Sequence, residues 1–305
     1  MAAVAGALGA ALLVAFFRGS FLGLGVGTVL SPVPLAMTAL GLGLAYLPVA
    51  VIGGAVTVGV LTGSFALAAI YLLIDAVPVA ALARLSAVGN GDVSGKAIGH
   101  RVALLAVGAA VFLSLVLVLM PHADGIEAAV RAWVTNMFAA MPQPSGMSET
   151  DFGTLREQFV KATAGVLPAG GAWNWILRAV ISIAFAQHLL HRMKIELWPT
   201  PAYRTFATPG WYFILFAVIG IAGMAVKGDV GYVAGNAAIA LCLPLFLQGL
   251  AVVHCAVKRV AHSTAWLVVF YTAALFLPVF AWLALVGLAV SDHVFHIRTR
   301  YLGAI

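Results

Sequence analysis

Long runs of apolar residues without any charge are the feature that most restricts the fold of this chain. One run extends from Val102 to Met120, and another extends from Thr264 to Val290. A helix needs about 20 apolar residues to cross a bilayer, whereas barrel strands alternate apolar and polar residues. Only 9% of the residues are charged and 63% are hydrophobic, against about 25% charged residues in soluble domains. The sequence therefore predicts an all-α, polytopic helical membrane protein.

The apolar runs predict about eight to ten transmembrane helices. The last run would be about 40 Å long as one helix, so we favour a hairpin at Leu277-Pro278 within it. The first run has no basic residue before it, unlike a signal peptide, and we expect it to be retained as a span. The candidate spans lie near residues 2–17, 21–45, 47–62, 64–83, 102–120, 172–191, 210–226, 231–256 and 264–290.

One long polar stretch, residues 121–171, separates a Gly/Pro-rich membrane half (1–120, about five spans) from a second membrane half (172–305). Its first part carries an amphipathic stripe suited to a membrane surface. After a Pro-rich turn, Ser148 with Asp151 three positions later is typical of a helix start. We expect two short helices here. The stripe consists of Ile126, Ala129, Val130, Trp133, Met137 and Phe138.

The charges of the connections predict sidedness. Basic residues dominate the connections around 84–101, 192–204 and 258–259, whereas the 121–171 segment has more acids than bases. Basic connections face the cytoplasm, so we expect the polar segment to be external and the N-terminus to be cytoplasmic. We expect the location to be a bacterial inner (plasma) membrane. The acids of the external segment are Asp124, Glu127, Glu149, Asp151 and Glu157, and its bases are Arg131, Arg156 and Lys161.

Glycine and proline are dense between residues 23 and 63. Small residues allow helices to pack closely in lipid, and this is the simpler interpretation. A sharper one is that Ser31-Pro-Val-Pro34 breaks a span into two half-helices around a binding cavity, because two prolines remove backbone donors at membrane depth. On this interpretation the substrate-binding residues are Thr28, Ser31, Pro32, Pro34, Asp75 and Asn174.

Polar residues within the spans leave alternatives open. Asp75 can contact a substrate, proton or cation, or it can be an interfacial carboxylate paired with Arg84. Asn174 and Arg178 share a helical face and can bind an anion, although we favour Arg178 reaching the outer interface. Gln248 lies deep in an apolar run, where it can join two helices or contact a substrate.

No pattern for catalysis is found, and we expect no enzyme activity, cofactor or metal. The chain lacks the Gly-x-Ser-x-Gly, His-Glu-x-x-His and phosphate-loop motifs. The histidine pairs 188/191 and 293/296 have no carboxylate cluster beside them. Cys242 and Cys255 would be about 20 Å apart on one helix, too far for a disulfide. No basic stripe interleaved with aromatic residues indicates nucleic-acid binding.

Two stretches carry a family resemblance. Pro244-Leu-Phe-Leu-Gln-Gly-Leu-Ala-Val-Val-His254 with Asp292…Arg298-x-Arg300, and the segment Ser31 to Gly43, resemble the YybS-like family of uncharacterised bacterial multi-pass membrane proteins. The N-terminal half of that family is similar to the substrate-binding (S) components of energy-coupling-factor vitamin transporters. The resemblance implies a compact six-helix unit with an outward-open ligand cavity, energised by separate ATPase subunits.

We therefore expect a component that binds or transports a small solute, with the lipid bilayer, partner membrane subunits and a small-molecule ligand as its partners. The alternative is a non-transporting scaffold or assembly subunit of a larger membrane complex. An enzyme acting on lipid is a third interpretation, and it lacks an acid–base pair or a metal set.

Overall fold

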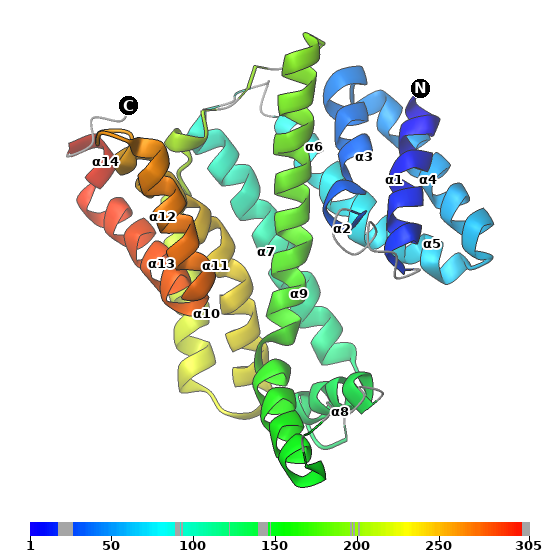
Figure 1. Ribbon diagram of the computed structural model, residues 1–305, viewed down its shortest axis with the longest axis vertical. Coiled ribbons are helices and arrows are strands. Elements are labelled where there is room, and N and C mark those ends of the chain that lie inside the picture. The colour runs from blue at the N-terminus through cyan, green and yellow to red at the C-terminus, as the bar shows by residue number, and fades with distance from the viewer. Residues whose placement is uncertain are drawn as a thin grey trace. The chain divides into compact units, whose positions relative to one another are not determined.

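The computed structural model contains helices and no strand among the residues it describes, which confirms the all-α fold (Figure 1). The chain divides into two compact units. Unit 1 comprises residues 1–105, 174–209 and 244–305, and unit 2 comprises residues 106–173 and 210–243. The described residues are 1–17, 27–88, 92, 94–121, 123–139, 146, 148–195, 197, 199–200 and 202–300, with the backbone alone at 16–17, 28 and 86–88.

Six helices are long and apolar enough to span a membrane in the described part of the chain, and four apolar helices of 10–17 residues accompany them. A polytopic membrane protein is therefore supported by both length and composition. The six are Leu44–Thr62, Phe65–Leu85, Gly95–Leu119, Glu149–Met193, Gly228–Val257 and Pro278–Phe295, and the four are Ala2–Ala15, Val33–Leu42, Gly210–Ala225 and Ser263–Phe276.

In unit 1, α1 (Ala2–Phe17) packs along α4 (Leu47–Thr62), as Figure 1 shows. Gly6 makes this approach possible, because a Cβ there would lie 1.8 Å from the carbonyl oxygen of Ala50. Gly54 is equally restricted, since its Cβ would lie 2.0 Å from the Tyr71 hydroxyl. The close-packing interpretation of the glycine-rich region is confirmed at Gly54, and Gly6 of α1 shows the same kind of approach outside that region.

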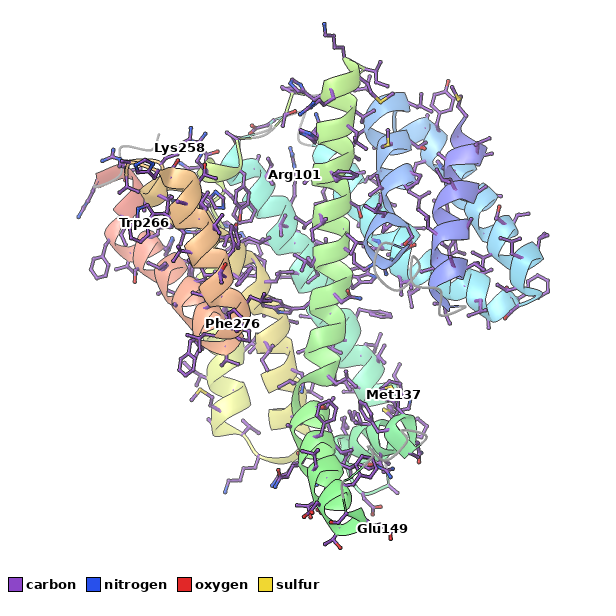
Figure 2. All side chains as sticks on the ribbon, viewed as in Figure 1. Arg101, Met137, Glu149, Lys258, Trp266 and Phe276 are labelled. Atoms are coloured by element: carbon purple, nitrogen blue, oxygen red, sulfur yellow. The ribbon has the colours of Figure 1, made fainter. Side chains whose placement is uncertain are left out.

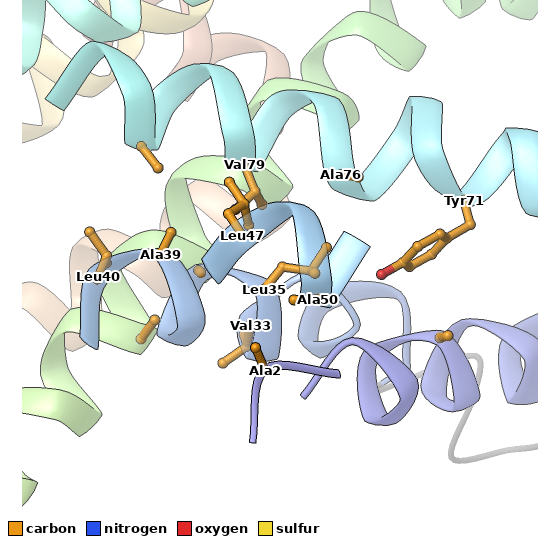
Figure 3. Close-up of a cluster of buried hydrophobic side chains, with 14 of the residues drawn as sticks. Ala2, Val33, Leu35, Ala39, Leu40, Leu47, Ala50, Tyr71, Ala76 and Val79 are labelled. Carbon is orange, nitrogen blue, oxygen red and sulfur yellow. The ribbon is translucent and has the colours of Figure 1, made fainter. Parts of the chain in front are cut away.

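The segment after residue 26 is broken, as its prolines predict. A three-residue helix, α2 (Thr28–Leu30), is followed by a turn at Ser31-Pro32, then by α3 (Val33–Met37) and a π-helical turn, η2 (Thr38–Leu42). A short 3-10 turn, η3 (Leu44–Tyr46), leads into α4. Residues of α1, α3, α4, α5 and α6 meet in one buried apolar cluster, part of which is shown in Figure 3.

A second π-helical turn interrupts the next span. This span consists of α5 (Phe65–Tyr71), η4 (Leu72–Ala76) and α6 (Val77–Val88). The helix α7 (Gly95–Leu119) then contributes its first residues to unit 1. Toward the C-terminus, unit 1 contains the short helix η5 (Tyr203–Thr205) and the second part of α11 (Gly228–Val257).

The predicted break of the last apolar run is confirmed. The helix α12 (Ser263–Phe276) ends before Leu277, α13 (Pro278–Phe295) begins at the proline, and the two helices pack against each other. Proline disfavours helical backbone in the residue before it, and Leu277 has φ −124° and ψ 56°. Trp266 and Phe276 of α12, labelled in Figure 2, are 56% and 77% exposed, as expected of a lipid-facing helix. A single turn, α14 (Ile297–Arg300), follows.

Unit 2 contains α8 (Ile126–Ala139), α10 (Gly210–Ala225) and parts of α7, α9 and α11. The predicted apolar stripe of α8 is buried only in part, because Ile126 and Val130 are buried whereas Trp133 and Met137 are exposed. The expectation of a second short helix is wrong. The helix α9 begins at Glu149, directly after Ser148 as predicted, but runs on for 45 residues to Met193.

The continuity of α9 through Pro168 has a physical cause in α11. Proline removes the hydrogen bond to the carbonyl of Ala164, and the Tyr232 hydroxyl donates to that carbonyl instead, at 2.6 Å. The side chain of Asn236 hydrogen-bonds to the next pair of backbone groups along α9. It accepts from the amide of Ala169 at 3.1 Å and donates to the carbonyl of Gly165 at 3.2 Å. Side chains of a neighbouring helix thus satisfy the freed backbone groups.

Candidate functional site

A buried polar cluster, formed by Ser31, Asp75 and Arg178, lies within unit 1. Nη2 of Arg178 donates to Oδ1 of Asp75 at 2.5 Å and to Oγ of Ser31 at 2.8 Å. Ser31 and Asp75 are fully buried and Arg178 is 6% exposed. Charges removed from water at this depth need a partner, and the ion pair supplies one for each of the two charged groups.

Irregular backbone positions this polar cluster. Ser31 lies in the turn between α2 and α3, and Asp75 lies in the π-helical turn η4. The helix α9 binds η4 at two points one turn apart, because Trp175 also donates its indole N–H to the carbonyl of Leu73 at 2.9 Å. Turns with π geometry inside helices are frequent at functional sites. Oδ2 of Asp75 and the hydroxyl of Tyr71 are buried without a hydrogen-bond partner in the described structure.

The structure brings together only some of the residues predicted to bind substrate. Pro32 and Pro34 are buried beside Ser31 in the broken segment, whereas Asn174 is exposed. The side chain of Thr28 lies outside the described residues. The predicted six-residue site stays a prediction, and an arginine that we expected elsewhere completes its polar part.

Two expectations about charged residues are wrong. Arg178 does not reach an interface, because it is buried against Asp75. Asp75 is therefore paired with Arg178 and not with Arg84, which is exposed. Both errors have the same cause: the partners are 103 positions apart, and the charge on one span is neutralised by another span.

A separate cavity of about 210 Å³ lies within unit 1, and none of the six predicted residues lines it. Its walls come from η2, α6, α7, α9, α11 and the connection after α9. Most of the lining is aliphatic. The described polar side chains that line it are Arg101, Gln187, Thr200 and Tyr203.

A connecting segment, residues 202–208, forms one wall of the cavity and packs closely on α7. The amide of Ala207 donates to the carbonyl of Gly95 at 3.2 Å. A Cβ at Gly95 or at Gly99 would lie 1.9 Å from the carbonyl oxygen of Thr205 or Ala207, so only glycine permits this approach. The Tyr203 hydroxyl donates to the carbonyl of Leu247 at 2.8 Å. The residue as a whole is 39% exposed, but withdrawal of the hydroxyl from water raises the pKa of Tyr203 well above its usual value.

A C-terminal clamp, formed by Gln248, Asp292 and Arg298, holds the other side of the connecting segment. Arg298 donates from Nε to Oδ2 of Asp292 at 2.9 Å and from Nη1 to the carbonyl of Phe206 at 2.7 Å. Asp292 also accepts from Nε2 of Gln248 at 3.0 Å. The Gln248 amide oxygen accepts from the backbone amide and the hydroxyl of Thr208. Gln248 therefore joins helices, as one of the two interpretations of its position predicted.

Sequence reasoning missed the cavity, although one local signal indicated it. Arg101 was counted only as a charge of a basic connection. On a helix, however, it shares a face with Ile98, Val102 and Leu105, so an arginine belongs to an otherwise apolar, inward-facing stripe. A stripe on one helix does not show which other helices form the remaining walls of the cavity.

Two further predictions concern cysteines and metal ligands. Cys242 and Cys255 are both buried and free, which confirms that they form no disulfide. Among the residues that the structure describes, no three histidine, cysteine or acidic side chains gather as a metal site would require.

These features define an α-helical polytopic membrane protein with a buried ion pair and a small internal cavity. The chain belongs to the family described as "Predicted membrane protein (DUF2232)", whose model matches residues 7–293. Searches of curated proteins and of solved structures found no match. The likeness to the YybS-like family and to transporter S components stays a prediction.

Proposed function

We propose that this membrane protein binds a small solute in the cavity of unit 1, as a non-catalytic binding or transport component that acts with partner membrane subunits. The observation that carries the proposal is the cavity itself: about 210 Å³ of space within a helical unit, lined by aliphatic side chains and a few polar groups. Apolar cavities with a small number of placed polar groups are the usual form of ligand sites.

The construction of the wall supports a defined site. The connecting segment is fixed on one side by Gly95 and Gly99 and on the other by the C-terminal clamp. Gln248, Asp292 and Arg298 are all buried, and burial of polar side chains costs free energy that their hydrogen bonds must offset. The bonds of Gln248 and Arg298 to this short segment fix its position. A wall held in this way is preorganised, so a ligand loses less free energy on binding than it would by ordering a loose segment.

The solute is tested by recovering it from protein purified out of its own membrane. Mass spectrometry of the extracted protein should detect a stoichiometric small molecule. The variant Ala184→Trp places an indole in the cavity and should abolish its recovery, because Ala184 is a lining residue. Ala162→Trp is the matched control, since Ala162 is an exposed residue of the same helix, α9, and does not line the cavity.

Equal recovery from the two tryptophan variants would contradict the cavity as the binding site. Absence of any small molecule, together with stoichiometric membrane proteins in the preparation, would instead favour the scaffold alternative. That alternative requires no cavity, so Ala184→Trp should then leave the recovery of the partner proteins unchanged.

We also propose a bacterial inner-membrane location with a cytoplasmic N-terminus and an external 121–171 segment. The charge distribution supports it. Single cysteines at Lys96 and at Glu127, both exposed, are introduced into a variant that lacks the two natural cysteines. In intact spheroplasts an impermeant maleimide should label position 127 and spare position 96. Labelling of position 96 alone would reverse the proposed orientation.

A further inference from the structure

We infer that the solute is a small organic acid whose anionic group is bound by Arg101 while its apolar body lies against the aliphatic walls of the cavity. This inference rests on the proposed function, because it assigns a ligand class to the same cavity. It depends on a different observation, which is that the guanidinium of Arg101 is buried without an ion pair in the described structure. Arg101 lies on α7, where Figure 2 labels it.

The three buried arginines of the described structure differ in one respect. Arg178 is paired with Asp75 at 2.5 Å, and Arg298 is paired with Asp292 at 2.7 Å. Arg101 is buried to the same degree, at 6% exposed, but it has no ion pair in the part of the chain described here. The fold supplies a directly paired carboxylate to two of its buried guanidinium groups, whereas in the described structure the third has only the electrostatic influence of the exposed Asp92.

The unpaired state of Arg101 is costly. Its Nη2 atom is buried and has no hydrogen-bond partner among the described residues. A buried guanidinium without an anion loses its hydration without compensation, which disfavours the arrangement unless something else binds there. Asp92 is the acid nearest to it along the chain, but that side chain is exposed and accepts from the amide and hydroxyl of Ser94 at 2.8 and 3.2 Å.

The other lining residues select against a cation and favour an apolar body. No described lining residue is an acid, so a cation would meet only the positive charge of Arg101. The hydroxyl of Tyr203 is already used by the carbonyl of Leu247. The remaining surface includes Val102, Val180 and Ile183, which suit aliphatic or aromatic carbon. Arginine binds carboxylates through two parallel hydrogen bonds, and Arg101 is the described cationic side chain among the lining residues.

The volume limits the size of the acid. An engineered protein cavity of about 150 Å³ holds benzene, so a cavity of 210 Å³ holds a molecule of about eight to nine non-hydrogen atoms. Benzoate is of this size and carries a carboxylate on an apolar ring. Benzamide and benzylamine have nearly the same shape with a neutral and a positive group. These three compounds form a matched set in which charge is the main variable.

The test is a titration of the purified full-length protein in detergent with benzoate, benzamide and benzylamine, followed by calorimetry. Benzoate should bind at least tenfold more tightly than benzamide, because a charge-assisted hydrogen bond contributes at least this factor. Arg101→Gln should remove this preference while benzamide still binds, which also shows that the variant is folded. Arg84→Gln, at an exposed arginine, should leave the preference unchanged.

The possible failures are distinguishable. If the three compounds bind equally and Ala184→Trp abolishes all binding, the cavity is a ligand site and the anionic class is wrong. If benzoate is preferred and Arg101→Gln retains the preference, the assignment to Arg101 is wrong. If no compound binds and no molecule is recovered from the native membrane, the proposed function fails with the inference.

An anionic lipid headgroup is a second source of an acid group, and the experiment separates it from a free acid. The benzoate titration is repeated in nanodiscs of phosphatidylcholine and of phosphatidylglycerol. Equal benzoate affinity in the two lipids supports a free small acid, because the headgroups then do not enter the cavity. Loss of benzoate binding in phosphatidylglycerol alone would overturn the free-acid assignment in favour of the headgroup.

Discussion

Replacement of Asp75 by asparagine tests whether the buried polar cluster is an ion pair or a set of ordinary hydrogen bonds. The two descriptions predict different losses of stability. Removal of one member of a buried ion pair costs about 3–5 kcal/mol, because the other charge stays buried without a partner. An interhelical hydrogen bond in a membrane protein contributes on average about 0.6 kcal/mol. Asp75 is fully buried and lies 2.5 Å from Arg178, so we expect the larger loss.

The expected loss corresponds to a change of roughly 100- to 4,000-fold in the unfolding equilibrium constant. It is measured by titrating the protein from mild detergent into dodecyl sulfate and following helix content by circular dichroism. The double variant Asp75→Leu/Arg178→Met should recover most of the loss, because replacement of a buried ion pair by apolar residues is often neutral or stabilising. Glu157→Gln is the control, since Glu157 is an exposed acid of α9.

A loss below about 1 kcal/mol for Asp75→Asn would refute this reasoning, because it is the size expected of a hydrogen bond between neutral groups. A double variant as unstable as the single variants would refute it in another way. Such a result would mean that each residue stabilises the fold through contacts other than those with its partner.

Three further predictions concern hydrogen bonds to the α9 backbone, close packing at a glycine and the pH dependence caused by Tyr203. Asn236→Ala should lower the free energy of unfolding by about 1–3 kcal/mol, and adding Pro168→Ala should recover part of the loss because the α9 backbone hydrogen bonds can re-form. Equal stability of the single and double variants would contradict this. Gly54→Ala should cost about 1–3 kcal/mol, whereas Gly59→Ala, which meets open space, should be neutral or stabilising in the same titration. Because the pKa of Tyr203 is raised by burial, its contribution to stability is complete below pH 10, the usual pKa of tyrosine, and is lost as the pH rises further. Above pH 10 the free energy of unfolding should therefore fall less with rising pH in Tyr203→Phe than in the natural protein. Identical pH profiles of the unfolding free energy would refute the assignment.

The features predicted correctly from the sequence depend on local information. The apolar runs predicted a helical membrane protein, for which the described structure has six helices long and apolar enough to span a membrane and four shorter apolar ones. The Leu277-Pro278 break follows from a steric restriction between adjacent residues. The start of α9 after Ser148 is a capping pattern of the same local kind, since the Ser148 hydroxyl accepts from the amide of Asp151 at 3.1 Å.

The features that sequence reasoning missed depend on distant partners. The continuation of α9 through Pro168 requires Tyr232 and Asn236, more than 60 positions away. The burial of Arg178 requires Asp75, and the cavity beside Arg101 requires walls from several helices. In lipid a polar residue must find a partner somewhere in the bundle, but a single sequence does not say which one.

The C-terminal clamp has a consequence for the order in which the protein matures during synthesis. Arg298 follows the last of the six helices that can span a membrane in the described part of the chain, so the ribosome has made these six before this residue emerges. The connecting segment is made about 90 residues earlier, and its Phe206 carbonyl has no clamp until Arg298 arrives. The wall of the cavity is therefore completed only after these six helices have been made, so their insertion alone does not yet form the clamped wall.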